Sequence, residues 1–466
     1  MYYLYNQKKI KFIDEISKFI NYNSINHPIA FTRVDFNIPI GETNSPLSVA
    51  RIKQNKETIL LLLKLGYIVV LISHFGQPTS INPDYSLKKI LKYIENEYQI
   101  NVNILPYELD KAAKTILINT QNIKKQKSLQ FYDFNNSLYL LENIRFYSGE
   151  IENNLNFAKK ISELSQNEDS IYVNDAFSVS HRHHASICSL PIFFPNKSYG
   201  GLALKQELLL LDKYVGHLRN MESKKIQYIN KTSILDNKIK DNNNTFNDKF
   251  NISVVIIGGK KITTKLPLIK NLSQKLDYII LGGAIANTFS IALGKKIGSS
   301  FYEPEMIDFA MEIYLKSKAK IILPQDYIVV ENTVVESTTI NTTDIIKKDY
   351  IHKFSEDNIS GEIGDIGEIT IKNVISIIKK ANILIWCGPL GRYEIPELSN
   401  GTDSVANIVA QETSHRALTS IAGGGDTIAA LGKYAEKFTY CSTAGGAFMM
   451  WIEDELPGLI ALQNND

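Results

Sequence analysis

Cysteine is scarce in this sequence of 466 residues, and its three cysteines lie far apart. Cys188, Cys387 and Cys441 form no CxxC pair, which argues against a disulfide framework and against a structural zinc cluster. A reducing compartment suits such a chain best, so we expect a cytoplasmic protein.

Long hydrophobic runs and an excess of one charge are also lacking. The longest apolar runs, such as residues 59–65, are far too short to cross a membrane, and the first twenty residues lack the basic-then-apolar order of a secretory signal. Lys and Arg total 51 against 49 Asp and Glu, which leaves a formal net charge of +2. No overall field therefore exists to hold nucleic acid or an anionic membrane, and any anion site must be built locally. We expect small-molecule partners.

The sequence does contain the composition of a globular chain, with 44% hydrophobic and 21% charged residues, and its length suits two or three domains. Short apolar runs alternate with helical patterns, which is typical of βαβ units and parallel sheets. We predict an α/β protein with two doubly wound, Rossmann-like parallel-sheet domains joined by a hinge helix. The expected strands lie in 29–37, 67–75, 101–107, 137–146, 170–178, 252–259, 278–283, 320–330, 381–389, 420–425 and 440–446.

The region between the two halves has a different composition. Residues 202–215 have a helical apolar pattern that follows two glycines, and they predict a stiff connection with a hinge. Residues 216–250 are rich in Asn and Lys and without clean periodicity, which indicates a solvated, low-complexity insertion. Residues 331–360 are expected to form a surface excursion.

Glycines follow predicted strands four times in the second half, in GGKK (258–261), GGA (282–284), CGPLG (387–391) and GGGDT (423–427). Glycine allows backbone N–H groups to face a ligand, and a following helix offers its positive end to phosphate. We expect the four turns to share the sheet edge at the carboxyl ends of the strands, where doubly wound folds bind ligands. A single such turn is more often ordinary turn chemistry, but four together indicate a ligand site. The Walker and dinucleotide fingerprints are absent.

Three charged residues beside these glycines are candidate phosphate or metal ligands. Lys261 and Lys265 are four apart and are expected on one face of a first helical turn, directed toward phosphates; the alternative is a pair of solvated lysines. Asp426 follows three glycines, where a carboxylate either caps a helix or holds Mg²⁺.

Basic and polar residues gather near strand ends in the first half. Arginine binds phosphate and carboxylate through two hydrogen bonds, so arginines from separate loops are expected to form a pocket for a small dianion. A solvated surface role is the alternative for each. The candidates are Arg33, Asp35, Asn37, Arg51, His74, Arg145, Asn174, Asp175, His181 and Arg182. The spacing of His181, His183 and His184 does not favour zinc.

An anion pocket on one sheet and a phosphate-binding glycine edge on another indicate a transferase that joins an acidic metabolite to a nucleotide while excluding water. Ten segments then resemble, in order, the signatures of the phosphoglycerate kinase family. They are RVDFNIP (33–39), SHFGQP (73–78), LLENIRF (140–146), VNDAFSVSHRHHAS (173–186), GGKKITTKLP (258–267), ILPQD (322–326), DIG (365–367), GPLGRYE (388–394), GGGDT (423–427) and STAGGAF (442–448).

The resemblance implies a glycolytic enzyme that reversibly transfers a phosphoryl group between 1,3-bisphosphoglycerate with ADP and 3-phosphoglycerate with ATP, directly and after hinge closure. It implies a phosphoglycerate-binding domain (1–204, with the tail 453–466 packed back on it) and a nucleotide-binding domain (251–452), which lie on either side of the interdomain helix (205–215) and the insertion (216–250). It also implies Mg²⁺ and a monomer.

The resemblance further implies roles for single residues. Phosphoglycerate would be held by Asp35, Asn37, Arg51, His74, Arg145 and Arg182. The nucleotide would be held by Lys261, Lys265, Gly282, Gly283, Glu394, Gly423, Gly424, Gly425, Asp426 and Thr427, with Mg²⁺ on Asp426. The catalytic residues would be Arg51, Lys261, Gly424 and Gly425, which would stabilise the group in transit.

The chain departs from the family pattern at several positions. Gln77 stands where Arg is usual, which predicts weaker phosphoglycerate binding, and Cys387 stands where Asn is usual. Arg392, Glu368 and Ala284 are also unusual. A non-catalytic relative that keeps nucleotide binding is therefore the alternative, and an NAD-dependent oxidoreductase is a weaker one because its fingerprint is missing.

Overall fold

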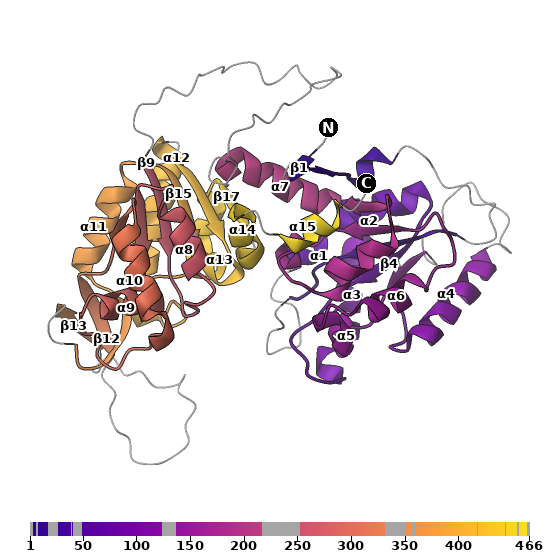
Figure 1. Ribbon diagram of the computed structural model, residues 1–466, viewed down its shortest axis with the longest axis horizontal. Helices are drawn as coiled ribbons and strands as arrows, with labels where there is room; N and C mark the ends of the chain where they lie inside the picture. The colour runs from indigo at the N-terminus through magenta and orange to yellow at the C-terminus, as the bar shows by residue number, and fades with distance from the viewer. Residues whose placement is uncertain are drawn as a thin grey trace, which may run out of the picture. The chain divides into compact units, whose positions relative to one another are not determined.

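The computed structural model divides into two compact units (Figure 1). It describes residues 3–5, 8–16, 27–38, 40, 49–123, 137–216, 252–330, 351–355, 359–416, 418–442, 444–453 and 456–463. Among these, the first unit comprises the residues up to Lys213 together with those from 456 onward, and the second runs from Tyr214 to Glu453. The predicted insertion lies outside the described residues from 217 onward, as do 331–350 and 356–358 of the predicted surface excursion.

A six-stranded parallel sheet forms the centre of the first unit, with the strand order β5-β6-β4-β3-β7-β8. The strands are β3 (Ile29–Arg33), β4 (Ile68–Ile72), β5 (Asn103–Ile104), β6 (Leu138–Leu140), β7 (Ile171–Asn174) and β8 (Ser198–Gly200). The helices are α1 (Ala50–Gln54), α2 (Lys56–Leu65), α3 (Leu91–Tyr98), α4 (Leu109–Ile123), α5 (Ser148–Ile151) and α6 (Leu155–Ser162). All residues of β3, β4 and β7 are buried, as expected for parallel strands covered on both faces.

Both ends of the described chain belong to this unit. A hairpin of β1 (Tyr3–Tyr5) and β2 (Lys8–Ile10) precedes the sheet, and the short helix α15 (Pro457–Ala461) follows the second unit in sequence. The Tyr5 hydroxyl accepts a hydrogen bond from the Leu456 N–H at 2.8 Å, and the Gly458 N–H donates to the Ser180 carbonyl at 2.8 Å. The C-terminal helix is thus held by the hairpin and by the loop after β7.

The predicted helix over 202–215 is observed as α7 (Leu202–Val215). Its apolar side chains recur at helical spacing, and Leu204, Leu208, Leu211 and Val215 are fully buried. Asp175, just after β7, accepts a hydrogen bond from the Leu204 N–H at 3.1 Å, so a buried carboxylate holds the first turn of the helix.

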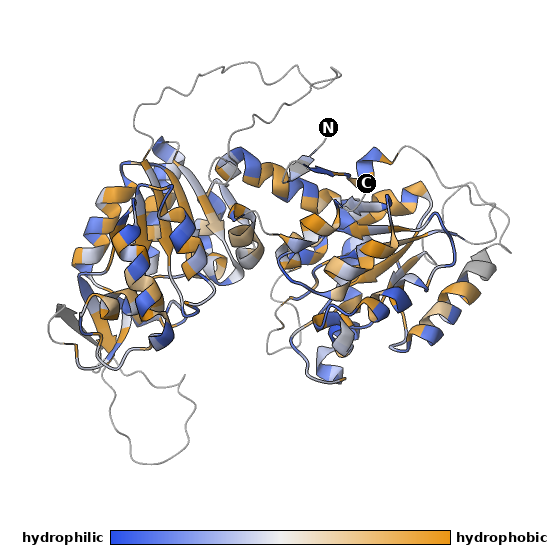
Figure 2. Cartoon of the chain, viewed as in Figure 1, coloured by the Kyte–Doolittle hydropathy of each residue, from blue (hydrophilic) through white to orange (hydrophobic). Residues whose placement is uncertain are grey.

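A second six-stranded parallel sheet, with the order β11-β10-β9-β15-β16-β17, forms the centre of the second unit. The strands are β9 (Ile252–Ile257), β10 (Tyr278–Leu281), β11 (Lys320–Ile322), β15 (Ala381–Cys387), β16 (Thr419–Gly423) and β17 (Tyr440–Ser442). The helices are α8 (Leu266–Leu272), α9 (Gly283–Ala292), α10 (Ile307–Lys316), α11 (Glu368–Ile378), α12 (Asn400–Arg416), α13 (Gly425–Leu431) and α14 (Gly445–Ile452). Figure 2 shows predominantly hydrophobic strands between helices that carry hydrophilic residues on their outer faces.

One predicted strand is wrong as a single element. Residues 320–330 form two strands, of which β11 lies in the parallel sheet and β12 (Asp326–Val330) lies in a small antiparallel sheet with β13 (Ile351–Ser355) and β14 (Glu362–Ile366). Pro324 lies between them, and proline lacks the N–H needed to continue a ladder. The fold therefore consists of the two predicted doubly wound parallel sheets plus this antiparallel addition.

None of the described helices is long and apolar enough to cross a membrane.

Candidate active site

The four glycine turns of the second unit lie at one edge of its sheet, as predicted. Strands β10, β9, β15 and β16 are neighbours and run parallel, so their carboxyl ends meet at the same edge. Backbone hydrogen bonds join the turns: the Gly258 N–H donates to the Cys387 carbonyl at 3.1 Å, and the Gly283 N–H donates to the Leu390 carbonyl at 3.2 Å. Backbone bonds thus join three of the four turns, and we call the surface that all four form the glycine edge.

The glycine edge is crowded at the first turn, around Gly258, and open at the fourth, around Gly425. A β-carbon placed on Gly258 would lie 1.9 Å from the carbonyl oxygen of Pro389, so no side chain fits there. Gly424 has a φ of +110°, a conformation that side chains rarely adopt. Its neighbour Gly425 is exposed, and a β-carbon placed on it would meet no atom within 4 Å. The Gly424 N–H donates to the Ser442 carbonyl at 2.9 Å, so it is Gly425 whose backbone faces open space at the start of α13.

The two candidate lysines do not lie on a helical turn, and that prediction is wrong. Helix α8 begins at Leu266, so Lys261 lies in the preceding loop and Lys265 occupies the position before the helix. Lys261 is exposed, whereas the Lys265 ammonium donates to the carbonyls of Gly258 at 2.5 Å and Cys387 at 3.4 Å. Burial lowers the pKa of Lys265. One lysine is thus fixed against the glycine turns, and the other extends into solvent, where it can reach a ligand.

Asp426 and Thr427 lie in the first turn of α13 and differ in their surroundings. Asp426 is exposed, and no side chain caps this helix. The Thr427 hydroxyl donates to the Gly423 carbonyl at 2.7 Å and accepts from the Gly388 N–H at 2.8 Å. Thr427 therefore fastens two of the glycine turns together, while the Asp426 carboxylate faces solvent.

Glu394 and its neighbour Arg392 follow the third glycine turn. Glu394 is exposed. Arg392 forms an ion pair with Glu362 of β14, and burial lowers the pKa of its guanidinium. Arg392, one of the departures from the family pattern, is therefore engaged with the small antiparallel sheet. Cys387, another departure, is a buried free cysteine at the end of β15, and burial raises its pKa to about 12, so it stays a neutral thiol.

In the first unit, Asp35 is the centre of the candidate anion site. This buried carboxylate forms an ion pair with Arg51 at 2.7 Å (Nη1 to Oδ2) and accepts a hydrogen bond from the Ser178 hydroxyl. Arg51 also donates to the Asn37 carbonyl at 2.9 Å. His74 lies beside it, with 3.8 Å between Nδ1 and Asp35 Oδ1. The ends of β3 and β4, helix α1 and the loop after β7 thus bring these side chains together.

His74 is neutral at this site. Burial lowers its pKa well below the ordinary value, and the positive charges of Arg33, Arg182 and Arg51 act in the same direction. The Arg33 guanidinium lies 3.3 Å from His74 Nδ1. A neutral imidazole beside an arginine can accept a hydrogen bond on that nitrogen, which fixes the ring.

Arg182 contributes a further positive charge. Its pKa is lowered by burial and by the charges of Arg33 and Arg51, and it is raised by Asp35. Arg51 and Arg182 therefore lie in the field of Asp35, whereas Arg33 acts on the buried Glu150, so three guanidinium groups face two carboxylates. This excess of positive charge favours an anion at the mouth formed by the strand ends.

Arg145 is attached to the turn after β4. Its Nη1 donates to the Gly76 carbonyl at 2.5 Å, and the Gly76 N–H donates to Asn37 Oδ1 at 2.8 Å. Gln77 follows directly and is exposed. The turn that carries Gln77 is thus held by two of the predicted site residues, which brings all six predicted first-unit residues into one neighbourhood.

Two supporting residues were not predicted. Ser178 bonds to Asp35, and the fully buried Glu150 accepts hydrogen bonds from the Ser186 N–H at 2.8 Å and hydroxyl at 2.6 Å. Arg33 Nε in turn donates to the Ser186 hydroxyl at 2.9 Å. Ser178 lies in a loop segment already singled out for its neighbours, but nothing in the local sequence around Glu150 indicates that it supports this site.

The comparisons with known proteins bear on this arrangement. The sequence model described as "Phosphoglycerate kinase" matches residues 21–224 and 232–455. This chain belongs to the phosphoglycerate kinase family. A phosphoglycerate kinase of Wolbachia sp. subsp. Drosophila simulans is 36% identical over 444 residues, covering 92% of this chain and 94% of the relative. One from Bartonella henselae is 34% identical over 440 residues, covering 92% and 95%.

A solved structure agrees with the sequence comparisons. The phosphoglycerate kinase of Coxiella burnetii is 28% identical, covers 94% of this chain and 97% of its own, and has a TM-score of 0.65. The enzyme from Pyrococcus horikoshii, at 23% identity and a TM-score of 0.65, shares the fold. The chain is therefore a glycolytic kinase that transfers a phosphoryl group between 1,3-bisphosphoglycerate with ADP and 3-phosphoglycerate with ATP, and the non-catalytic alternative is not favoured.

Proposed function

We propose that phosphoglycerate binds at the Asp35 site of the first unit, that ADP or ATP binds at the glycine edge of the second, and that the phosphoryl group passes directly between them. The observation that carries this proposal is the excess of guanidinium charge around Asp35, which suits a small dianion. Direct transfer needs positive charge and N–H donors rather than a protein nucleophile, and both units supply these.

In the first unit, we assign Asp35, Asn37, Arg51, His74, Arg145 and Arg182 to phosphoglycerate. Asp35 holds Arg51 through an ion pair of 2.7 Å, so the guanidinium is placed before the substrate arrives. Arg51 is then available to stabilise the charge on the transferring group. The links from Arg145 and Asn37 to Gly76 support a role for both in shaping the same pocket.

In the second unit, we assign Lys261, Lys265, Gly282, Gly283, Glu394, Gly423, Gly424, Gly425, Asp426 and Thr427 to the nucleotide. The exposed Lys261 would meet the phosphates, and the open backbone at Gly425 would donate its N–H group to an oxygen of the group in transit. Gly424, whose N–H donates to the Ser442 carbonyl, would hold the turn in the shape that this requires. Thr427, which bonds to the Gly388 N–H and the Gly423 carbonyl, keeps these turns in position.

Asp426 is the residue that would hold Mg²⁺. Its exposed carboxylate lies next to the glycine turns, and Mg²⁺ accepts oxygen ligands from one or two carboxylates together with nucleotide phosphates and water. Among the described residues, no group of three or more His, Cys, Asp or Glu side chains could hold a metal, so most ligands would have to come from the nucleotide and water. The ion would neutralise phosphate charge during transfer.

The domain assignment follows from these roles. We assign 1–204 with the tail 453–466 to phosphoglycerate, 205–215 to the interdomain helix, 216–250 to an insertion and 251–452 to the nucleotide; the division of the described residues near Lys213 and Glu453 supports this. We further propose that the protein acts as a monomer in the cytoplasm, in line with the sequence expectations.

The test is turnover by the purified full chain with ATP, Mg²⁺ and 3-phosphoglycerate, coupled to a dehydrogenase that reports 1,3-bisphosphoglycerate. Turnover that disappears on chelation of Mg²⁺ and returns on its addition is expected. No turnover in a preparation with a cooperative unfolding transition would contradict the proposal.

A substitution at Asp426 tests the assignment of this residue to Mg²⁺ separately. Asp426→Asn should raise the Mg²⁺ concentration needed for half-maximal turnover about tenfold or more, because one anionic ligand is lost. Asp308→Asn is the matched control, since Asp308 is also exposed and also lies in the first turn of a helix, α10. Equal Mg²⁺ requirements in both variants would remove Asp426 from the metal site.

A further inference from the structure

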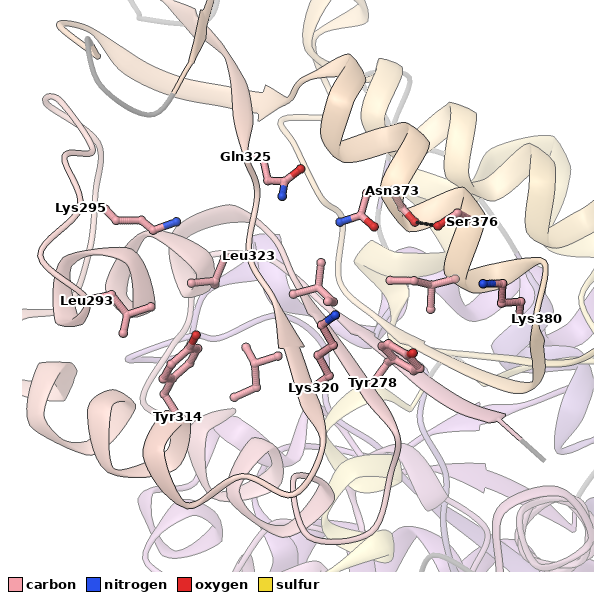
Figure 3. A pocket seen from close by; sticks show the side chains of 13 residues that line it. Tyr278, Leu293, Lys295, Tyr314, Lys320, Leu323, Gln325, Asn373, Ser376 and Lys380 are labelled. Atoms are coloured by element: carbon pink, nitrogen blue, oxygen red, sulfur yellow. Dashed lines mark hydrogen bonds between the residues drawn. The ribbon is translucent and has the colours of Figure 1, made fainter. Parts of the chain in front are cut away.

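A groove of about 740 Å³ runs along β11, the edge strand of the sheet in the second unit (Figure 3). Tyr278 and Lys320 begin β10 and β11, and Lys380 directly precedes β15, so the groove includes the amino ends of these strands. The glycine turns lie at the carboxyl ends of the neighbouring strands. The groove continues past the carboxyl end of β11 to Gln325, but none of the residues that line it belongs to a glycine turn, so it is distinct from the candidate active site.

Three lysines from separate elements line this groove, which we call the β11 groove. Lys295 comes from the loop after α9, Lys320 from β11 and Lys380 from the turn after α11. None of the residues that line it in the described part of the chain is acidic. In Figure 3 the ammonium groups of Lys295 and Lys320 point toward the space along the strand, and Lys380 reaches in from the side of α11.

The nearby carboxylates are engaged elsewhere. Asp277, next to Tyr278, accepts hydrogen bonds from the Ser253 N–H at 2.8 Å and hydroxyl at 2.7 Å. Asp326 accepts from the N–H groups of Ile369 and Thr370 at the start of α11. Lys320 and Lys380 have no ion-pair partner among the described residues. The positive charge of these two lysines is therefore not neutralised within the described structure.

Neutral hydrogen-bonding groups complete the lining. The side-chain amides of Gln325 and Asn373 project from the segment between β11 and β12 and from α11, and the tyrosine rings of Tyr278 and Tyr314 lie along the opposite stretch (Figure 3). The volume is within the range of small-molecule sites, roughly 300–1,000 Å³. Ammonium groups from three elements suit a ligand whose phosphates are spread over several ångströms better than a single phosphate.

We propose that the β11 groove is a second anion-binding site, separate from the catalytic one, which takes a small molecule with a chain of phosphate groups. Such a ligand is either an inorganic polyphosphate or a nucleoside polyphosphate, and the shared chemistry is the phosphate chain. The tyrosine rings would add stacking area for a base in the second case.

The test follows methyl NMR signals of the full-length protein during titration with tripolyphosphate and, separately, ATP. Ile321 and Ile377 line the groove, whereas Ile428 lies in α13 beside the glycine edge. Saturable shifts at Ile321 and Ile377 with either probe, weakened by added salt, are expected. Shifts at Ile428 alone would overturn the proposal, because binding would then be confined to the glycine edge.

Two charge-matched double variants test the lysines. Lys320→Gln/Lys380→Gln should weaken tripolyphosphate binding at Ile321 and Ile377 at least tenfold. Lys318→Gln/Lys379→Gln removes the same charge from exposed residues that do not line the groove, and it should change binding less than threefold. An equal loss in both would overturn the proposal by showing only a general charge effect.

The two probes identify the source of the phosphate chain. Binding of ATP at Ile321 and Ile377 that is at least threefold tighter than that of tripolyphosphate supports a nucleotide, and equal or weaker binding supports an inorganic polyphosphate. Neither double variant changes a residue assigned to catalysis, so the ATP KM for turnover should stay within twofold of the original in both. A rise in that KM confined to the Lys320→Gln/Lys380→Gln variant would contradict the separation of the two sites.

Discussion

Asp35 lies between Arg51 and Arg182, while Arg33 beside them interacts with Glu150, and this surplus of guanidinium groups over carboxylates decides what the first unit attracts. Its ion pair with Arg51 is partly exposed on the arginine side, with 22% of that side chain accessible. The guanidinium therefore has one edge fixed by Asp35 and another free for a substrate oxygen. This explains how a protein with a net charge of only +2 forms a strong local anion site.

Replacing that arginine should separate chemistry from binding. Arg51→Ala is expected to lower kcat by about 10²–10³-fold, because charge developing on the transferring group loses its partner, while the nucleotide KM stays within about threefold. Steady-state kinetics with both substrates varied checks this. Arg51→Lys should keep part of the activity. A fall in kcat of less than fivefold in the alanine variant would contradict the catalytic role.

Gln77 offers the opposite change, a gain of charge. Gln77→Arg adds a guanidinium to an exposed position of the turn held by Arg145 and Asn37, so the KM for 3-phosphoglycerate should fall about two- to fivefold at low salt. Thr79→Arg, at another exposed position two residues further on, should change KM less. If the two variants behave alike, position 77 does not face the substrate.

The buried carboxyl group of Asp365 should make the free energy of unfolding of the second unit depend on pH. Burial raises its pKa to about 7, although the N–H groups of Ile366 and Gly401 bond to it. The folded state therefore binds a proton that the unfolded state has already released, so the free energy of unfolding should fall as pH rises from about 4 to about 7. The shift corresponds to roughly 2–4 kcal/mol over that window.

The measurement is urea unfolding from pH 4.5 to 8 in the original chain and in Asp365→Asn. The chain has two tryptophans, Trp386 and Trp451, and both are buried in the second unit, so tryptophan fluorescence follows that unit alone. Asn cannot ionise, and the difference between the two proteins should decline with rising pH. A difference that does not change with pH would show that Asp365 does not titrate in this range.

At the scale of single elements, the helix α15 contacts the loop that carries residues of the anion site. Its Gly458 bonds to the Ser180 carbonyl, and Ser180 is two residues from both Ser178 and Arg182. A β-carbon at Gly458 would lie 2.9 Å from Ser180 Cβ and 2.9 Å from a methyl group of Ile187. The short C-terminal helix thus fixes the loop that supplies two groups near Asp35.

Gly458→Ala should push this helix away. We expect a loss of about 1–3 kcal/mol in the free energy of unfolding of the first unit and a rise in the KM for 3-phosphoglycerate, with the ATP KM unchanged. Circular dichroism and steady-state kinetics measure these. Ile460→Ala alters an exposed side chain of the same helix and should have little effect. An unchanged KM in the glycine variant would mean that α15 stabilises the unit without shaping the site.

Helices and strands were predictable where the segment's own apolar pattern or turn residues indicate its structure. Strands such as β3, β4 and β9 and the helix α7 fall within their predicted ranges, because fully buried strands and periodic helices leave clear apolar patterns. The edge strand β8 was not predicted, and β16 begins one residue before its predicted range. The division of 320–330 was missed although Pro324 indicated it. The position of Lys261 and Lys265 was missed although Pro267 marks a helix start close by. The link from Glu150 through Ser186 to Arg33 had no local signal, because it joins segments more than thirty residues apart along the chain.

At the scale of the whole molecule, the two units have separate cores. One core packs β3, β4 and β7 against residues of α2, and another packs β9 and β15 against α11 and α12. Each candidate site is built from the strand ends of its own unit. Each ligand should therefore first stabilise the loops of the unit that binds it.

Hydrogen exchange should reveal this division. Saturating 3-phosphoglycerate is expected to slow exchange by about tenfold or more in the loops after β3, β4 and β7, and ADP with Mg²⁺ should do so in the turns after β9, β15 and β16. Mass spectrometry of digested protein after timed labelling gives the protection of each segment. Protection by 3-phosphoglycerate that is confined to the glycine turns would reverse the assignment of the two units.

The close approach of the backbone at Gly258 to that at Pro389 affects how substitutions at the glycine edge are interpreted. Gly258 is closed to any side chain by the carbonyl of Pro389, whether or not a ligand is present. Gly425, in contrast, has room for one. In a library of all substitutions selected for glycolytic growth, intolerance at Gly258 therefore reports on steric packing, whereas intolerance at Gly425 reports on the nucleotide.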